Sequence, residues 1–493
     1  MGGAGAEAWI AGGLCVQDDS AVALDIEIRN GCIAALHLPG APCPQGLQAV
    51  DARRRLVVPG LVNAHVHSPD SLIRGSAPEL PLELWSLHSA AGRVERTVEE
   101  TILAVRLTAA ELLRAGVTSV VDHIRFDPAL RPDLLDAVAR AWRDTGMRVV
   151  IAPVLADRPP AETLPLIDED FCPSGRPPSG YGRGAMLHWR EQIALVEEFA
   201  ARWHEIDGRI QVAAAPSGPQ RCTDDLLRAA GDLSMRRGLL LHMHVLETRA
   251  QRAMAFQLYG RGMIAHLADL GLLTPRTHLV HAIWLEDGDL DIIARSGASV
   301  VHNPVSNAKL GSGFCAVPEM VARGIRVALG TDSACCNDSG DLLETAKWTA
   351  LLHNFNERDP ARWIGPHRAF GMATRQGADV LGLAGRAGRI EPGLEADLAL
   401  FPLDHPAFAP LIDPVRHLVL SAGRVAPEAV FVQGRAVVQN GRCTQIDEAT
   451  MMQEAQVAAE RRLGANAATY AAASDLVEPI RRMYARLESS EGA

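Results

Sequence analysis

Short apolar runs alternate with longer stretches of helical apolar spacing from about Gly60 to Gly388. The runs are nearly continuous in apolar, β-branched residues, as expected for parallel strands covered on both faces. Eight of them occur: Leu61–His67, Val117–His123, Met147–Ala156, Ile210–Pro216, Leu239–Glu247, His278–Leu285, Ala298–Val305 and Arg326–Ser333. Eight such units predict an α/β fold with a (β/α)₈ TIM barrel over residues 59–388. An open doubly wound sheet is the alternative, which is disfavoured because polar residues end nearly every run, as one barrel mouth would explain.

The two flanks of the barrel show a different pattern. They contain short apolar runs that predict strands, and Asn30-Gly31 and Asn440-Gly441 are two-residue turns favoured in hairpins. Neither flank is large enough to fold alone, so residues 1–58 and 389–446 are expected to combine into one small β-sandwich domain. Residues 447–493 are rich in Ala, Glu and Arg and predict a helical tail. The predicted strands of the small domain are Ala21–Ile28, Cys32–Leu36, Ala396–Phe401 and Val430–Val438.

A Pro- and Gly-rich segment, Asp157–Arg183, interrupts the barrel pattern after the third strand. Its six prolines and three glycines exclude a regular helix. Long loops in compact domains are usually functional or mobile, and barrel-mouth loops often carry function. A substrate-covering lid and a passive surface insertion both fit this pattern.

Composition and charge narrow the class of protein. Hydrophobic residues make up 48% and charged residues 22%, the formal net charge is −11, and the nine cysteines are scattered. The negative charge disfavours nucleic-acid binding, and no apolar run approaches the roughly 20 residues of a membrane span. Scattered cysteines, with no basic residue ahead of the first apolar stretch, indicate reduced thiols in a cytoplasmic protein. We expect a homo-oligomer, a dimer or tetramer, that acts on small molecules and has no nucleic-acid or membrane partner.

Candidate metal ligands lie at the ends of three predicted strands. His65 and His67 alternate on the first strand, so both side chains face the same side. The fifth strand offers two candidates, His242 and His244. Both face the same side of the strand, so their spacing does not decide which of them is the ligand. Glu247 follows and turns into the pocket only if this strand ends near Leu246.

The eighth strand closes the predicted ligand set. It ends at Asp332, and in a closed barrel it lies beside the first strand. Three imidazoles and one carboxylate form a set typical of Zn²⁺, and also acceptable to Fe²⁺, with a position left for water. The sequence therefore predicts one divalent metal per chain, with Zn²⁺ preferred.

Beyond these spacings, the chain resembles the amidohydrolase superfamily from about Ala8 to Val438. The resemblance lies in the segments 59–67, 244–247 and 330–332 and in His281. Two further segments, 302–311 and 388–397, resemble its aminohydrolase branch, which contains triazine hydrolases and guanine and adenosine-analogue deaminases. The resemblance implies a metal held by His65, His67, His244 and Asp332. The lysine that bridges two metals in some members is not visible, which favours a single-metal site.

The activity implied by this resemblance is that of an aminohydrolase, or deaminase, on a purine, pterin or triazine ring. A bound divalent cation lowers the pKa of water from 15.7 to roughly 7, which gives a hydroxide nucleophile at neutral pH. Asp332 is then the expected proton acceptor, Glu247 the proton shuttle to the leaving group, and His281 a group that orients or stabilises charge. Hydrolysis of a C–Cl bond, an N-alkylamine or a cyclic amide is the alternative. A non-catalytic barrel with an assembly role is a further one, disfavoured by the intact ligand set.

The substrate contacts depart from the branch at one position. Many of its deaminases carry a histidine after the fourth strand, where this chain has Ser217. The particular heterocycle is therefore not set by analogy. The candidate substrate-binding residues are Trp85, Ser217, Gln220, His302, Asn303 and Asn307.

Overall fold

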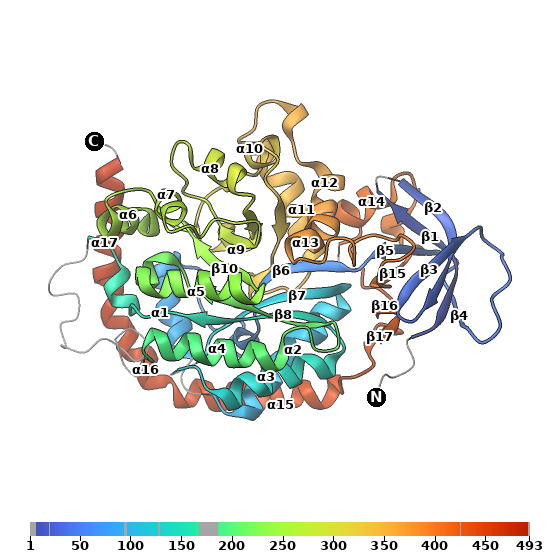
Figure 1. The fold of residues 1–493 in the computed structure, drawn as a ribbon, viewed down its shortest axis with the longest axis horizontal. Coiled ribbons are helices and arrows are strands. Elements are labelled where there is room, and N and C mark those ends of the chain that lie inside the picture. Colours follow the sequence, from blue (N-terminus) through green and yellow to red (C-terminus); the bar gives the residue numbers. More distant parts are fainter. Residues whose placement is uncertain are drawn as a thin grey trace.

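The structure is a computed structural model, and it describes residues 6–18, 20–92, 96–126, 129–166, 186–423 and 425–491. Within these ranges, a closed sheet of parallel strands forms the centre of the molecule (Figure 1). Only Gly330 and Thr331 separate its last two strands, and the second of these, β14, pairs with the first strand, β6, which closes the barrel. The barrel strands are β6 (Leu61–His67), β7 (Val117–Ile124), β8 (Arg148–Leu155), β9 (Ile210–Pro216), β10 (Leu240–Val245), β11 (Thr277–His281), β12 (Ser299–His302), β13 (Val327–Leu329) and β14 (Asp332–Ser333). The predicted (β/α)₈ barrel is confirmed.

Helices surround this sheet, and local signals fix several of their ends. Thr97 and Glu100 form a capping box at the start of α2, and Gly146 and Gly238 end α3 and α5 in the left-handed conformation that glycine favours. The helices are α1 (Leu82–Gly92), α2 (Val98–Arg114), α3 (Pro132–Thr145), α4 (Trp189–Trp203), α5 (Asp224–Arg237), α6 (Arg249–Tyr259), α7 (Met263–Asp269), α8 (Asp289–Ser296), α9 (Pro304–Lys309), α10 (Val317–Ala322), α11 (Leu342–Leu352), α12 (Gly365–Ala373), α13 (Arg375–Val380) and α14 (Pro414–Arg416). No helix in the described part of the chain has both the length and the apolar character needed to cross a membrane.

The small domain is built from both ends of the chain. Its strands are β1 (Ala8–Gln17), β2 (Ser20–Arg29), β3 (Cys32–His37), β4 (Gln48–Asp51), β5 (Arg55–Pro59), β15 (Leu398–Pro402), β16 (Ala429–Val432), β17 (Arg435–Gln439) and β18 (Arg442–Cys443). They form one hydrogen-bonded sheet, in which β5 pairs antiparallel with β15. Side chains from both ends, including Ile10, Ile26, Leu398 and Phe431, share its apolar core. Each segment supplies part of a core that neither could bury alone.

The hairpin turns explain the register of this sheet and one error. Asn30-Gly31 and Asn440-Gly441 turn with positive φ at both residues, as predicted. The predicted strand Val430–Val438 is wrong as a single element, because Gln433 and Gly434 (φ 47° and 69°) turn the chain between β16 and β17. A Cβ at position 434 would lie 2.7 Å from Ile28 Cγ2, so the turn needs glycine for space as well as conformation.

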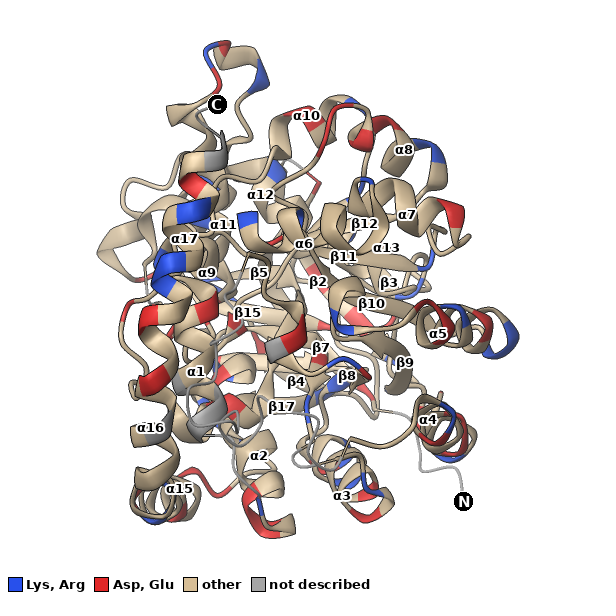
Figure 2. Ribbon diagram, turned by 90° about the vertical axis from the view of Figure 1, so that its left-hand side faces the viewer, with Lys and Arg blue, Asp and Glu red and all other residues tan. Residues whose placement is uncertain are grey.

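The tail packs along one side of the barrel as α15 (Glu448–Ala465), α16 (Ala467–Ala473) and α17 (Val477–Glu491) (Figures 1 and 2). An apolar cluster joins it to α1 and α6. In this cluster Leu87 of α1 and Ala250 of α6 pack with Ile480 and Met483 of α17. The last helix is therefore anchored beside the C-terminal ends of the barrel strands.

Candidate metal centre

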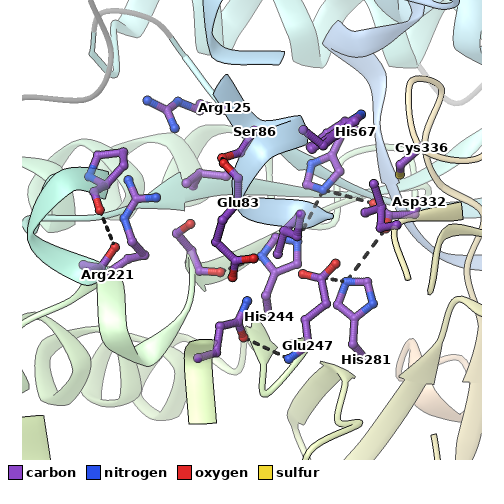
Figure 3. Close-up of a pocket in the computed structure, with 18 of the residues that line it drawn as sticks. His67, Glu83, Ser86, Arg125, Arg221, His244, Glu247, His281, Asp332 and Cys336 are labelled. Carbon is purple, nitrogen blue, oxygen red and sulfur yellow. Dashed lines mark hydrogen bonds and ion pairs between the residues drawn. The ribbon is translucent and has the colours of Figure 1, made fainter. Parts of the chain in front are cut away.

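Four side chains from three barrel strands converge at the barrel mouth. The Nε2 atoms of His65 and His67, both on β6, each lie 3.4 Å from Asp332 Oδ1 on β14. His244 Nε2 on β10 lies 3.3 Å from His67 Nε2. Figure 3 shows His67, His244 and Asp332 directed toward one another. The structure thus brings together the four residues predicted as ligands.

The opposite ring nitrogen of each histidine has a partner that fixes the ring. His67 Nδ1 lies 2.6 Å from the His123 carbonyl oxygen, and His244 Nδ1 lies 2.6 Å from the Ser217 carbonyl oxygen. His65 Nδ1 lies 2.9 Å from His242 Nε2. Metal-bound histidines usually donate their second N–H in this way, which fixes tautomer and orientation. The spacing left His242 and His244 open, and the structure places His242 behind His65 and His244 at the convergence point.

The donor atoms are suited to a divalent cation. His65 Nε2 is buried and forms no hydrogen bond in the part of the chain that the structure describes. Burial lowers the pKa of His65 to about 4 and that of His244 well below its usual range, so both rings are neutral and offer a lone pair. Asp332 adds a carboxyl oxygen, Oδ1, that faces the Nε2 atoms of His65 and His67. Neutral imidazoles and one carboxylate form a chemically matched ligand set.

His123 is a further member of the group that the sequence reasoning missed. Nitrogens of His65, His67, His123 and His244 all lie within 4.8 Å of one another. The His123 ring stacks on His244 at 4.8 Å between centroids, and both its nitrogens are buried and without a hydrogen bond among the described residues. Its position at the end of the predicted second strand was the available signal. His123 can offer an additional nitrogen ligand.

Backbone geometry and hydrogen bonds fix the Asp332 carboxylate. Asp332 has a φ of 65°, an uncommon value for a residue other than glycine, at the turn that carries it into the mouth. Its Oδ1 accepts from the Ser333 N–H at 2.8 Å, and its Oδ2 accepts from the Ser306 hydroxyl at 2.7 Å. The carboxylate is therefore held in one orientation beside the imidazoles.

Glu247 and His281 lie against the same group. His281 Nε2 is 3.6 Å from Glu247 Oε2 and 3.8 Å from Asp332 Oδ2 (Figure 3). Strand β10 ends at Val245 and Leu246 has a φ of 51°, so Glu247 turns inward as the sequence argument required. Burial, with the nearby charges of Asp332 and Glu83, raises the pKa of Glu247 well above its usual range. Glu247 therefore keeps its proton to higher pH than an ordinary carboxyl does, which suits a proton donor.

A pocket opens above these residues. It is lined by His67, His244, Glu247, His281 and Asp332, and also by Trp85, Ser217 and Gln220, three of the predicted substrate-binding residues. Its wall includes Glu83 of α1, which the sequence reasoning did not single out. Glu83 Oε1 accepts from the Thr248 hydroxyl at 2.6 Å, and Oε2 accepts from the Tyr484 hydroxyl of the tail. A buried carboxylate from outside the metal group thus faces the same pocket.

A model of the amidohydrolase family matches residues 56–437. The chain belongs to the amidohydrolase family. Members of this family are hydrolases, and the curated relatives of this amidohydrolase act on carbon–nitrogen bonds. The 5′-deoxyadenosine deaminase of Methanosarcina mazei is 32% identical over 418 residues, which cover 83% of this chain and 87% of the relative. The 5-methylthioadenosine/S-adenosylhomocysteine deaminase of Nitratidesulfovibrio vulgaris is 32% identical over 453 residues, covering 90% and 94%.

Solved structures resemble this amidohydrolase along nearly its whole length. An adenosine deaminase from Xanthomonas campestris with bound zinc superposes with a TM-score of 0.82 at 26% identity, covering 93% of this chain and 99% of that one. Atrazine chlorohydrolase from Arthrobacter aurescens, complexed with zinc, gives 0.81 at 23% identity, covering 92% and 99%, and shares the fold. The expected membership of the superfamily is confirmed.

Three of the predicted substrate-binding residues lie elsewhere in this amidohydrolase. His302, Asn303 and Asn307 are fully buried and do not line the pocket. Asn307 Oδ1 is 2.8 Å from His281 Nδ1, and Asn303 Nδ2 is 3.4 Å from the same atom. Substrate contact by these three residues stays a prediction, which their place outside the pocket lining does not favour. The two asparagines contact the Nδ1 atom of His281 and hold its ring.

Only the start of the Pro- and Gly-rich segment lies within the described residues. Pro160, Thr163 and Leu164 line the pocket. The part from residue 167 onward, which includes Phe171, lies outside the described residues, so the proposed lid stays a prediction.

Proposed function

We propose that this amidohydrolase is a metal-dependent deaminase that replaces the exocyclic amine of a purine nucleoside with oxygen and releases ammonia. The observation that carries the proposal is the placement of two buried carboxyls, Glu247 and Asp332, beside one imidazole, His281, with burial raising the pKa of Glu247. A proton acceptor and a proton donor side by side are what amine hydrolysis requires. The deaminase relatives and the zinc-containing adenosine deaminase support this choice of reaction.

The metal would be held by His65, His67, His244 and Asp332, with His123 beside them, and we propose one Zn²⁺ per chain. When bound, a divalent cation of this kind lowers the pKa of water to about 7 and so supplies hydroxide at neutral pH. The solved relative with bound zinc supports Zn²⁺ over Fe²⁺.

The protein's own side chains account for the proton transfers. As water adds to the ring carbon that bears the amine, Asp332 accepts the proton that the water loses. Glu247 donates its proton to the amine nitrogen, the C–N bond breaks, and ammonia leaves. His281, whose ring is held by Asn307, lies 3.6 Å from Glu247 and stabilises the charge that develops on the ring.

Glu83 and Trp85 support a nucleoside rather than a free base. Glu83 is the buried carboxyl of this wall, and its oxygens accept from the Thr248 and Tyr484 hydroxyls. Hydroxyl groups thus already bind at this carboxyl, and we expect it to contact the sugar hydroxyls of a nucleoside as well. Trp85 is buried in the same wall and offers an aromatic surface to the substrate.

A product screen with the zinc-loaded protein tests this proposal. Adenosine, 5′-deoxyadenosine, 5′-methylthioadenosine, guanine, a pterin, an aminotriazine and atrazine would be supplied separately, with ammonia and chloride measured. We expect ammonia from at least one adenosine-type nucleoside and little from guanine or the pterin. Chloride from atrazine without ammonia from any nucleoside would refute the proposal and favour the chlorohydrolase alternative. No product from any compound, in a protein without bound metal, would favour the non-catalytic one.

A further inference from the structure

A line of three histidines extends from the candidate metal centre into the barrel interior. His65 Nδ1 is 2.9 Å from His242 Nε2, and His242 Nδ1 is 3.3 Å from His278 Nδ1. His278 Nε2 is 2.8 Å from the backbone carbonyl oxygen of Val380, the last residue of α13. All three imidazoles are completely buried. One end of the line is a backbone acceptor and the other is a candidate metal ligand.

The backbone carbonyl sets the direction of every hydrogen bond in this line. A carbonyl oxygen can only accept, so the His278 proton lies on Nε2. Burial lowers the pKa of His278 to about 4, so its ring is neutral and its Nδ1 is a bare acceptor. His242 must then donate from Nδ1. The His242 ring is completely buried, where a charged imidazolium is disfavoured, so with its proton on Nδ1 its Nε2 is bare and accepts the N–H of His65 Nδ1.

The same assignment of protons fixes the tautomer of His65. With its proton on Nδ1, the lone pair of His65 lies on Nε2, the nitrogen that faces Asp332 at 3.4 Å and has no hydrogen bond within the described residues. His67 and His244 reach the equivalent state through one backbone carbonyl each. His65 reaches it only through two intervening imidazoles.

We infer that Val380, His278 and His242 form a relay that fixes the tautomer of His65 and keeps its Nε2 lone pair directed at the metal centre. His242 and His278 are positioning residues, and neither lines the substrate pocket. The inference rests on the metal site of the proposed function but not on the choice of substrate. Second-layer partners of metal-bound histidines are typically worth 10–100-fold in metal affinity or activity, and the relay extends this effect by one further residue.

Three substitutions of His278 separate a relay from simple filling of the barrel core. His278→Asn places an amide oxygen near the position of Nδ1, so an acceptor for His242 is kept. His278→Gln places its amide near the position of Nε2, so the contact with Val380 is kept but the acceptor for His242 is lost. His278→Phe fills the space and removes both contacts. Space filling predicts similar metal affinity whenever the variants are similarly stable, whereas the relay predicts a difference between Asn and Gln.

The readouts need no substrate. Zinc affinity would be measured on the metal-free full chain by chelator competition, the free energy of unfolding by urea, and the imidazole tautomers by ¹⁵N NMR. We expect Gln and Phe to bind zinc 10–100-fold more weakly than wild type and Asn to stay within about threefold. In metal-free wild type, His65 should carry its proton on Nδ1.

Equal zinc affinity of the Asn and Gln variants, or a His65 proton on Nε2 in metal-free wild type, would overturn the relay. A wild-type chain that binds no zinc would overturn it too. If the product screen fails while these affinities behave as expected, the deaminase proposal falls and the relay stands.

Discussion

Glu247→Gln is the most informative single change in this amidohydrolase. The glutamine has the size of the protonated acid, so packing in the buried site is kept, and the hydrogen bond from the backbone N–H of residue 247 to Gln251 Oε1 (2.9 Å) is unaffected. What is lost is the transferable proton beside His281. Since Glu247 is not among the four converging metal donors, zinc content should remain that of wild type.

The size of the effect follows from the role assigned to this proton. Transfer by one positioned group is typically worth roughly 10²–10⁴-fold. At 1.36 kcal/mol per tenfold change, this corresponds to about 2.7–5.4 kcal/mol in the activation barrier. We expect kcat to fall by that range and KM to change little, because the lost interaction belongs to bond cleavage.

The pH dependence gives a second signature. The raised pKa of Glu247 means that its proton persists above the usual carboxyl range and is lost as pH rises through the shifted value. Wild-type kcat should therefore fall on the alkaline side, and the glutamine variant should lack that limb. The same shift affects the free energy of unfolding of the metal-free protein. The stability contributed by protonated Glu247 is fully present below pH 4.5, the ordinary pKa of a glutamate, and is lost as pH rises through the higher pKa of the folded state. Wild type should lose stability over that window, and the glutamine variant should not.

The assay is ammonia release by the zinc-loaded protein across pH, with zinc measured by mass spectrometry on the same samples. Glu391→Gln, at an exposed carboxylate of the small domain, is the matched control and should behave as wild type. A Glu247→Gln enzyme within tenfold of wild-type kcat, or one that has lost its zinc, would refute the assigned role.

Three other predictions concern the metal, the domain junction and the tail. Elemental analysis should give about one zinc per chain, and two occupied sites within ~4 Å would contradict the single-metal assignment. Arg148→Met removes a guanidinium that is 2% exposed, contacts Glu395 and lies 3.2 Å from Asp397. The free energy of unfolding measured in urea should therefore fall by about 3–5 kcal/mol. Arg53→Met, at an exposed ion pair, is the control and should have no measurable effect. Tyr484→Phe removes the hydroxyl that holds Glu83, so nucleoside KM should rise roughly 5–10-fold for a bond worth ~1–1.4 kcal/mol, with kcat and zinc unchanged. Tyr470→Phe is the control, and an equal rise in it would count against the assignment.

The sequence predicted site residues best where the two-residue repeat of a strand reaches the end of that strand. His65 and His67 lie two residues apart on one strand, so their common face followed directly from β geometry. The barrel's closure then placed Asp332 beside them. These inferences need only the residue spacing within one strand and the rule that the first and last strands of a closed barrel are neighbours. Both can be read from the sequence.

Other features depend on partners that no single segment shows. His123 was part of a predicted strand, yet its approach to His244 follows from the twist and register of neighbouring strands. Asn307 was a candidate substrate contact, and the structure shows that its side chain contacts Nδ1 of His281, a partner 26 residues away in the chain. Gln433-Gly434 was missed as a turn because the apolar residues on both sides read as one continuous strand.

The contact between Tyr484 and Glu83 has a consequence for synthesis of the protein. The ribosome has completed the barrel at residue 388, but the pocket wall is complete only when residue 484 has been added, 96 residues later. At ~5–20 residues per second, that interval lasts roughly 5–20 s. During this time the metal ligands can already assemble while Leu84 and Leu87 lack the apolar cover of α17. A chain cut short within the tail would therefore carry the candidate metal ligands but an incomplete pocket wall and exposed apolar side chains. Chaperones bind exposed apolar surface of this kind.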